Sequence, residues 1–148
     1  MPLIYTTLGS GRKIDAGCVW DARTALRRAH AFQEFQVEWL EEPLRPDDVE
    51  GYRWLRDRSP LPIAGGEEEC GRDAWRPLID ARALDVYQVD VARNGFTDAD
   101  YIKHRVQEIG ASEQIRVRSG DRLRLVKLDP TRPAEPPAPA QSSPENKP

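Results

Sequence analysis

Short apolar segments recur along the first 110 residues of this chain and alternate with longer amphipathic segments. Four of the apolar segments cover residues 12–15, 37–40, 61–64 and 84–89. Each is a short run with Val, Ile, Leu or an aromatic residue, and Gly, Pro or an acidic residue follows it closely. This pattern is typical of buried strands.

Four amphipathic segments follow these strands, and their apolar residues recur at intervals of three and four, which predicts helices that bury one face. Asp21 is the expected N-cap of the first helix, and Asp47 or Asp48 that of the second. Gly110 is expected at the end of the fourth. The apolar residues on the four faces are Ala22, Ala25, Leu26 and Ala29; Tyr52 and Leu55; Trp75, Leu78 and Ile79; and Ala99, Ile102, Val106 and Ile109.

Four strand–helix units of about 25 residues predict an α/β fold with a parallel sheet. Such units fit a (β/α)8 barrel of the TIM type or an open doubly wound sheet. A complete barrel needs roughly 250 residues, so a chain of 148 residues supplies only part of one. A phosphate-binding doubly wound domain is disfavoured, because the sequence has no Gly-x-Gly-x-x-Gly or Walker loop.

The composition changes near Gly110. Residues 1–110 carry 15 basic and 20 acidic side chains, whereas residues 111–148 carry 7 and 5. Between Ile115 and Lys127, polar and apolar residues alternate around a turn at residues 119–121, which predicts a hairpin. Its arginines allow a nucleic-acid arm as an alternative, but a charged edge hairpin is favoured because no aromatic residue lies between them.

Seven of the 13 prolines lie in the last 19 residues, which contain no Val, Ile, Leu or aromatic residue. Such a segment buries too little apolar surface to offset its ordering entropy, so it is expected to be a disordered tail. A polyproline ligand is the alternative. The expected division is a partial barrel over residues 1–110, an Arg-rich hairpin-like segment over 111–129 and the tail over 130–148.

Several classes of protein are disfavoured by charge and composition. A formal net charge of −3 argues against binding to nucleic acid through bulk electrostatics. No apolar run is long enough to span a membrane, and the N-terminus does not resemble a signal peptide. Two cysteines are too few for a disulfide framework, so a reducing, cytoplasmic compartment is expected.

A carboxylate lies at or just beyond the end of each predicted strand. These residues are Asp15, Glu41, Glu67 and Asp90, at intervals of 26, 26 and 23 residues. Parallel strands end at one rim, which is where barrels build their sites. Carboxylates gathered there repel one another unless a hard cation such as Mg²⁺ lies between them. Coincidence is the alternative, because 32% of the residues are charged.

Four local motifs raise the metal hypothesis above coincidence. They are Ile14-Asp15-Ala16-Gly17, Trp39-Leu40-Glu41-Glu42-Pro43-Leu44, Ile63-Ala64-Gly65-Gly66-Glu67, and Val89-Asp90-Val91 followed by Asn94-Gly95. In order, spacing and identity they resemble the enolase superfamily. The resemblance is closest to its mandelate racemase/muconate lactonizing enzyme branch, especially the acid-sugar dehydratase-like members, and it covers about residues 9–110.

The resemblance implies a Mg²⁺ site with Asp15, Glu41 and Glu67 as ligands. It also implies that Asp90 orients a catalytic histidine. Gly17 occupies a position where the family more often has Asn. The implied reaction begins with removal of the proton α to the carboxylate of a hydroxy acid. An acid-sugar dehydratase, which is a hydro-lyase, is the first expectation, and a racemase or epimerase is the second.

The family's proton-transfer groups are not found at the corresponding positions. Lys13 lies within the strand of a metal ligand, so it is not taken as the family's lysine base. The strand expected near residues 114–119 contains no histidine, and His30 and His104 are expected on helix surfaces. We therefore expect a truncated or frameshifted product with little activity. Its open sheet edges suggest self-association.

The rival reading is a non-catalytic metal- or partner-binding fragment that uses the hairpin or the tail. Cys18 and Cys70 are expected to be small buried or loop thiols. Arg93 is expected to meet either a substrate carboxylate or a surface acid. The remaining acids near the rim, which support the ligands or are merely solvated, are Glu42, Glu68 and Glu69.

Overall fold

A computed structural model describes residues 3–6, 12–119 and 122–126 of the chain. Seven strands form one sheet in which spatial order follows sequence order. They are β1 (Leu3–Thr6), β2 (Arg12–Asp15), β3 (Val37–Glu41), β4 (Ile63–Gly65), β5 (Val86–Asp90), β6 (Ser112–Ser119) and β7 (Arg122–Val126). Strands β2 to β6 run parallel, whereas β1 and β7 pair antiparallel with their neighbours.

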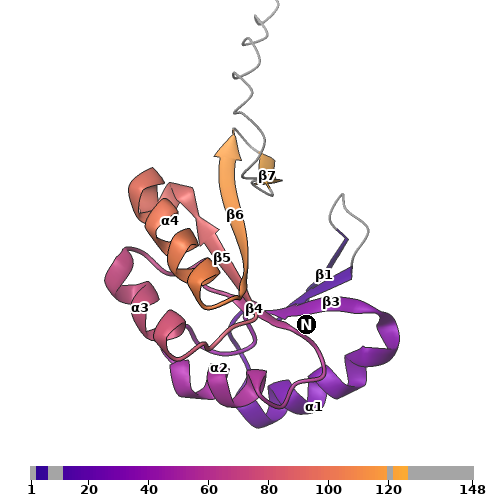
Figure 1. Ribbon diagram of the computed structural model, residues 1–148. Coiled ribbons are helices and arrows are strands. Elements are labelled where there is room, and N and C mark those ends of the chain that lie inside the picture. Colours follow the sequence, from indigo (N-terminus) through magenta and orange to yellow (C-terminus); the bar gives the residue numbers. More distant parts are fainter. Residues whose placement is uncertain (1–2, 7–11, 120–121, 127–148) are drawn as a thin grey trace, which may run out of the picture.

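Four helices connect the parallel strands, and a short 3-10 helix, η1 (Gln33–Phe35), follows the first of them. The four are α1 (Ala22–Phe32), α2 (Val49–Arg56), α3 (Arg72–Asp80) and α4 (Val91–Glu108). They lie together on the outer side of the curved sheet (Figure 1). The predicted α/β fold is therefore confirmed as part of a (β/α)8 barrel, with one helix after each of β2, β3, β4 and β5.

Local capping explains where the helices begin and end. Asp21 accepts a hydrogen bond from the Thr24 amide at 2.8 Å. Asp48, rather than Asp47, caps α2 by accepting from the Gly51 amide at 2.9 Å. Helix α4 begins before its predicted apolar face and bends at Gly95, whose φ of 69° and ψ of 168° are not helical.

Strands β4 and β5 each begin two residues later than predicted. Pro62 has no N–H, so it cannot donate to the ladder, although its carbonyl accepts from the Leu40 amide at 2.9 Å. Asp85 precedes β5, and its carboxylate fixes the position of the start of β4. Its Oδ2 accepts from the Ile63 amide at 2.9 Å, and its Oδ1 accepts from Arg56 Nε at 2.9 Å.

Side chains alternate between the two faces of the sheet and form two apolar clusters. The larger cluster fills the space between sheet and helices and includes Ile14, Leu40, Ile63, Tyr87, Val89, Leu55, Trp75 and Ile102. The smaller lies on the inner face and consists of Trp39, Ala64 and Val86. Lys13, Glu41 and Gln88 are also buried, and alternation places them on the inner face. Among the described residues, Gln88 Oε1 and Nε2 have no hydrogen-bond partner.

The C-terminal part contains the predicted hairpin, since β6 and β7 pair with Ser119 opposite Arg122. Its predicted turn at residues 119–121 is described only at Ser119. The predicted disordered tail, residues 130–148, lies outside the described residues. Strand β1 was not predicted from the sequence. No helix in the described ranges is long and apolar enough to cross a bilayer.

Candidate metal centre

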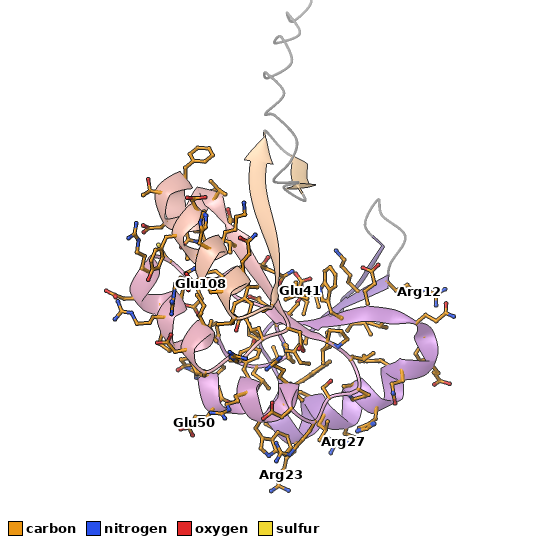
Figure 2. All side chains as sticks on the ribbon, viewed as in Figure 1. Arg12, Arg23, Arg27, Glu41, Glu50 and Glu108 are labelled. Atoms are coloured by element: carbon orange, nitrogen blue, oxygen red, sulfur yellow. The ribbon has the colours of Figure 1, made fainter. Side chains whose placement is uncertain are left out.

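The carboxyl ends of β2, β3, β4 and β5 lie along one edge of the sheet, called here the rim. Asp15 is the register partner of Glu41, and Glu41 is the partner of Ala64. The backbone pairing continues past the strands. The Ala16 amide donates to the Glu41 carbonyl, and the Glu42 amide donates to the Ala64 carbonyl, both at 2.9 Å. Figure 2 shows Glu41 in the interior of the fold, whereas Arg23, Arg27 and Glu50 project from helices. The predicted convergence of strand ends is therefore present.

Three carboxylates at the rim approach one another closely. Oxygens of Glu42, Glu67 and Glu68 all lie within 4.8 Å of each other. The group contains one of the three predicted ligands, Glu67. The other two, Asp15 and Glu41, lie at the ends of the neighbouring strands. Together these five acids form what we call the rim carboxylates.

Glu42 is the most constrained of the rim carboxylates. It is only 6% exposed, and its φ of 43° lies in the left-handed region. Its Oε2 accepts a hydrogen bond from Cys18 Sγ at 3.5 Å. Burial raises the Glu42 pKa to about 7; the Cys18 hydrogen bond opposes this rise, and the charges of Glu68, Asp15 and Glu41 add to it. From the sequence, Glu42 was expected either to support the metal ligands or to be a solvated acid. The burial of its side chain excludes the solvated alternative.

The two cysteines are free thiols in the loops after β2 and β4. Burial, followed by the Glu42 charge, raises the pKa of Cys18 to about 12, so its thiol stays protonated at neutral pH. Cys70 is exposed and donates to the Arg93 carbonyl, with Sγ and oxygen 3.3 Å apart. The expectation of small loop thiols is confirmed.

Asp15 and Glu41 are held by donors close to them in sequence. Asp15 Oδ1 accepts from the Gly17 amide at 2.8 Å, and Gly17 has a φ of +63° that favours glycine. Glu41 Oε2 accepts from the indole Nε1 of Trp39 at 3.0 Å. Both carboxylates are therefore oriented by the turn or the strand that carries them.

The loop between β4 and α3, which carries Glu67 and Glu68, is fastened by Asn94. Asn94 Oδ1 accepts from the Gly71 amide at 2.9 Å and from Trp75 Nε1 at 3.1 Å. Its Nδ2 donates to the carbonyls of Glu69 and Asp90 at 3.1 and 3.0 Å. Asn94 lies in one of the four sequence motifs, but the sequence predicts no role for it. Its four contacts belong to residues up to 25 positions away, so no local pattern reveals them.

Arg93 provides a positive charge beside the rim carboxylates. Its Nη2 lies 3.3 Å from Glu68 Oε2, and its Nη1 donates to the Glu68 carbonyl at 3.3 Å. Of the two readings of Arg93, the ion pair with an acid is the one present. About half of each side chain is exposed, so the pair contributes little to stability.

Asp90 lies at the end of β5 and caps α4, accepting from the Ala92 amide at 2.7 Å. His30 and His104 are exposed on α1 and α4, as predicted. His104 Nδ1 lies 2.8 Å from the Asp100 carbonyl of its own helix. Asp90 therefore orients a helix end in this structure, and neither histidine of the chain is placed to serve as its partner.

A surface cleft of about 590 Å³ lies next to the rim, between the loops after β2 and β3. The acidic residues that line this cleft already have hydrogen-bond or ion-pair partners. Asp21 and Asp48 cap helices, and Asp47 forms an exposed ion pair with Arg45 at 3.1 Å. We assign no ligand to this cleft.

The donor chemistry of the rim fits a hard divalent cation. Carboxylate oxygens are the ligands that Mg²⁺ and Ca²⁺ prefer, and Mg²⁺ commonly binds through one oxygen of each carboxylate while keeping several waters. A cation among the rim carboxylates would offset the repulsion that burial intensifies at Glu42. The rim can thus hold a metal ion and, through the ion, an anionic oxygen ligand.

Comparison with known proteins gives a family and several relatives. The family model described as enolase C-terminal domain-like matches residues 9–117. L-Talarate/galactarate dehydratase of Salmonella typhimurium is 37% identical over 82 residues, which cover 55% of this chain and 21% of that protein. L-Rhamnonate dehydratase of Saccharopolyspora erythraea is 40% identical over 79 residues, covering 52% and 20% respectively. The chain spans about a fifth of the length of these curated relatives.

Solved structures show the same similarity. The crystal structure of L-talarate dehydratase from Polaromonas sp. JS666, complexed with Mg and L-glucarate, aligns with a TM-score of 0.66 and 33% identity. The alignment covers 70% of this chain and 29% of that one. A racemase from Streptomyces coelicolor A3(2) with bound magnesium aligns with a TM-score of 0.65 and 27% identity, covering 68% and 30%.

Proposed function

Because this chain belongs to the enolase C-terminal domain-like family, we propose that it carries the magnesium-binding segment of an acid-sugar dehydratase. Asp15, Glu41 and Glu67 hold the ion in this proposal. The observation that carries it is the placement of the three acids on consecutive parallel strands. Asp15 and Glu41 are register partners at the ends of β2 and β3, and Glu67 follows β4 in the close group with Glu42 and Glu68. Relatives that act on acid sugars, and structures that contain Mg, support the choice of substrate class and metal.

A bound Mg²⁺ would supply positive charge that stabilises the negative charge developing when the proton α to a substrate carboxylate is removed. The chain's own residues then have separate tasks. Asp15, Glu41 and Glu67 bind the ion, and Asn94 keeps the loop of Glu67 in place. Arg93 neutralises Glu68, which limits the negative charge that an anionic substrate meets at the rim. Racemization or epimerization uses the same first proton removal and is the second choice of reaction.

Replacement of Glu41 by Gln tests the ligand assignment. Glu41→Gln keeps the shape of the side chain but removes the charge that attracts Mg²⁺. We expect Mg²⁺ at 100 times its Kd to stabilise the parent chain by about 2.7 kcal/mol, because the ion binds only the folded state. The substituted chain is expected to lose most of this gain, measured as the rise in Tm between EDTA and Mg²⁺.

Glu38→Gln is the matched control, because Glu38 lies on the same strand β3 but is exposed. It removes the same charge without touching the rim and should leave the Mg²⁺-dependent rise in Tm unchanged. A Glu41→Gln chain that responds to Mg²⁺ as the parent does would show that Glu41 is not a ligand.

A further inference from the structure

We propose that Trp39 is a positioning residue that sets how Glu41 coordinates the metal and thereby favours Mg²⁺ over Ca²⁺. The inference rests on the proposed function, in which Glu41 is a ligand. Trp39 and Glu41 are two residues apart on β3, so their side chains leave the same face of the sheet. The indole Nε1 donates to Glu41 Oε2 at 3.0 Å, and the two residues are 8% and 6% exposed. The hydrogen bond is thus formed largely out of contact with water.

The Trp39 ring is itself held in a fixed orientation. Lys13 is its register partner on β2, and Lys13 Nζ lies 3.9 Å from the ring centroid. Ala64 and Val86 on the next two strands pack with Trp39 in the inner apolar cluster. A cation against an aromatic face is attracted by the ring quadrupole, and burial strengthens this attraction. Because the ring is held from three strands, the direction of its N–H is set by the sheet rather than by Glu41.

A fixed donor on one carboxylate oxygen changes the way in which the carboxylate binds a metal. With Oε2 engaged by the indole, coordination through the other oxygen alone is favoured over coordination through both. Mg²⁺ demands near-ideal octahedral geometry with single-oxygen contacts, whereas Ca²⁺ accepts two oxygens of one carboxylate and six to eight ligands in total. Groups that hold a metal ligand in place commonly contribute 10- to 100-fold in metal affinity. Trp39 therefore acts on the choice of metal as well as on affinity.

The experiment measures Mg²⁺ and Ca²⁺ affinities of the full chain by isothermal titration calorimetry. Trp39→Phe keeps an aromatic face for Lys13 but removes the N–H. We expect it to weaken Mg²⁺ binding about 10- to 100-fold and Ca²⁺ binding less, so the ratio of the two affinities falls. Trp54→Phe is the matched control, because Trp54 is half-buried beside Arg58 and lies away from the rim. It is expected to leave both affinities within about twofold of the parent.

A second measurement, on the unsubstituted protein, tests the inference even if Trp39→Phe misfolds. Selective ¹⁵N labelling of the four tryptophans gives indole N–H signals, which single substitutions of Trp20, Trp54 and Trp75 assign by elimination. Mg²⁺ should shift the Trp39 signal and leave that of Trp54 in place. An unmoved Trp39 signal on Mg²⁺ saturation, or an unchanged Mg²⁺/Ca²⁺ ratio in folded Trp39→Phe, overturns the inference. A parent chain that binds no Mg²⁺ would instead contradict the proposed function itself, and the inference with it.

Discussion

Burial and repulsion from neighbouring acids both act on the carboxyl group of Glu42. Its backbone lies in the left-handed region, which is unfavourable for a residue with a Cβ. Its carboxyl is buried beside other acids, and this environment raises its pKa from 4.5 to about 7. Near neutral pH the metal-free protein therefore carries a substantial fraction of Glu42 in the protonated form. The carboxyl is the acceptor of the Cys18 thiol hydrogen bond, so its charge also affects the loop after β2.

The raised pKa of Glu42 predicts that the metal-free chain loses stability as pH rises. The folded state holds this proton more tightly than the unfolded state does, so the contribution is complete below pH 4.5 and is lost as pH passes through about 7. We expect the loss to be on the order of 2–3 kcal/mol between these limits. The measurement is urea unfolding in EDTA at pH values from 5 to 8.

Glu42→Gln separates this effect from the titration of other groups. The amide cannot ionise, so the slope of unfolding free energy against pH should be flatter than in the parent. Exposed Glu50→Gln is the control and should keep the parent's slope. Equal slopes for parent and Glu42→Gln would show that Glu42 titrates normally in the folded chain.

Residue types and intervals identified the rim acids in advance, because parallel strands of similar length must end at one edge. Local sequence also gave the cap at Asp21 and narrowed the second cap to Asp47 or Asp48, of which the structure uses Asp48; both caps depend on contacts within three residues. It could not tell that Glu42 is buried or that Trp39 donates to Glu41. Those facts depend on how the loop after β2 and strand β2 cover neighbouring strands. Burial of a polar residue is a property of tertiary packing, and one segment does not reveal it.

At the scale of elements, the loop from β4 to α3 depends on contact between Gly66 and helix α3. Gly66 has a φ of +98°, and a Cβ at this position would lie 2.5 Å from Cη2 of Trp75. Trp75 is fully buried and donates to Asn94, so its ring has little room to move. The backbone immediately before Glu67 therefore tolerates no side chain.

Gly66→Ala is expected to destabilise the chain by about 2–4 kcal/mol, combining the overpacking and positive-φ costs. It should also weaken Mg²⁺ binding, because displacement of the backbone at Gly66 moves Glu67. Urea unfolding gives the first quantity and calorimetric titration the second. Gly110→Ala is the control: its φ is +71°, but nothing lies within 4 Å of its Cβ position. A loss no larger than that of the control, about 1 kcal/mol, would show that the Trp75 contact does not constrain the loop.

The bounds of β2 to β5 were predictable to within about two residues, whereas β1 was missed and α4 begins well before its predicted apolar face. Strand β4 starts only after Pro62, which cannot donate a ladder hydrogen bond. Helix α4 starts at Val91, directly after its cap Asp90, and bends at Gly95, whereas the apolar periodicity begins only at Ala99. Periodicity locates the part of a helix that faces the core. It says little about a first turn whose main role is to connect a strand end.

At the scale of the whole molecule, strands β2 to β6 and their helices form a segment of a barrel whose outer face is covered (Figure 1). The ends of the strand order are β1 and β7, each antiparallel to its neighbour. Within the described ranges these are the outermost strands of the sheet, and the expected self-association through such edges stays a prediction. The rim lies at one end of this segment. A metal bound there would cross-link the ends of β2 and β3 and the loop after β4, so its binding should be visible in global stability.

The residues of this segment predict that the chain binds Mg²⁺ but does not turn over a substrate. It offers carboxylates for Mg²⁺, but its two histidines lie exposed on α1 and α4, and Lys13 is committed to the Trp39 ring. No described side chain at the rim is therefore assigned as the base for α-proton removal. We expect Mg²⁺ to stabilise the chain while galactarate in D₂O shows no exchange or elimination above the rate without protein. Proton NMR follows both processes, with the Salmonella typhimurium dehydratase named above as the positive control. Exchange of the α-proton that disappears in Glu41→Gln would show that the chain supplies a base of its own and is an enzyme as it stands.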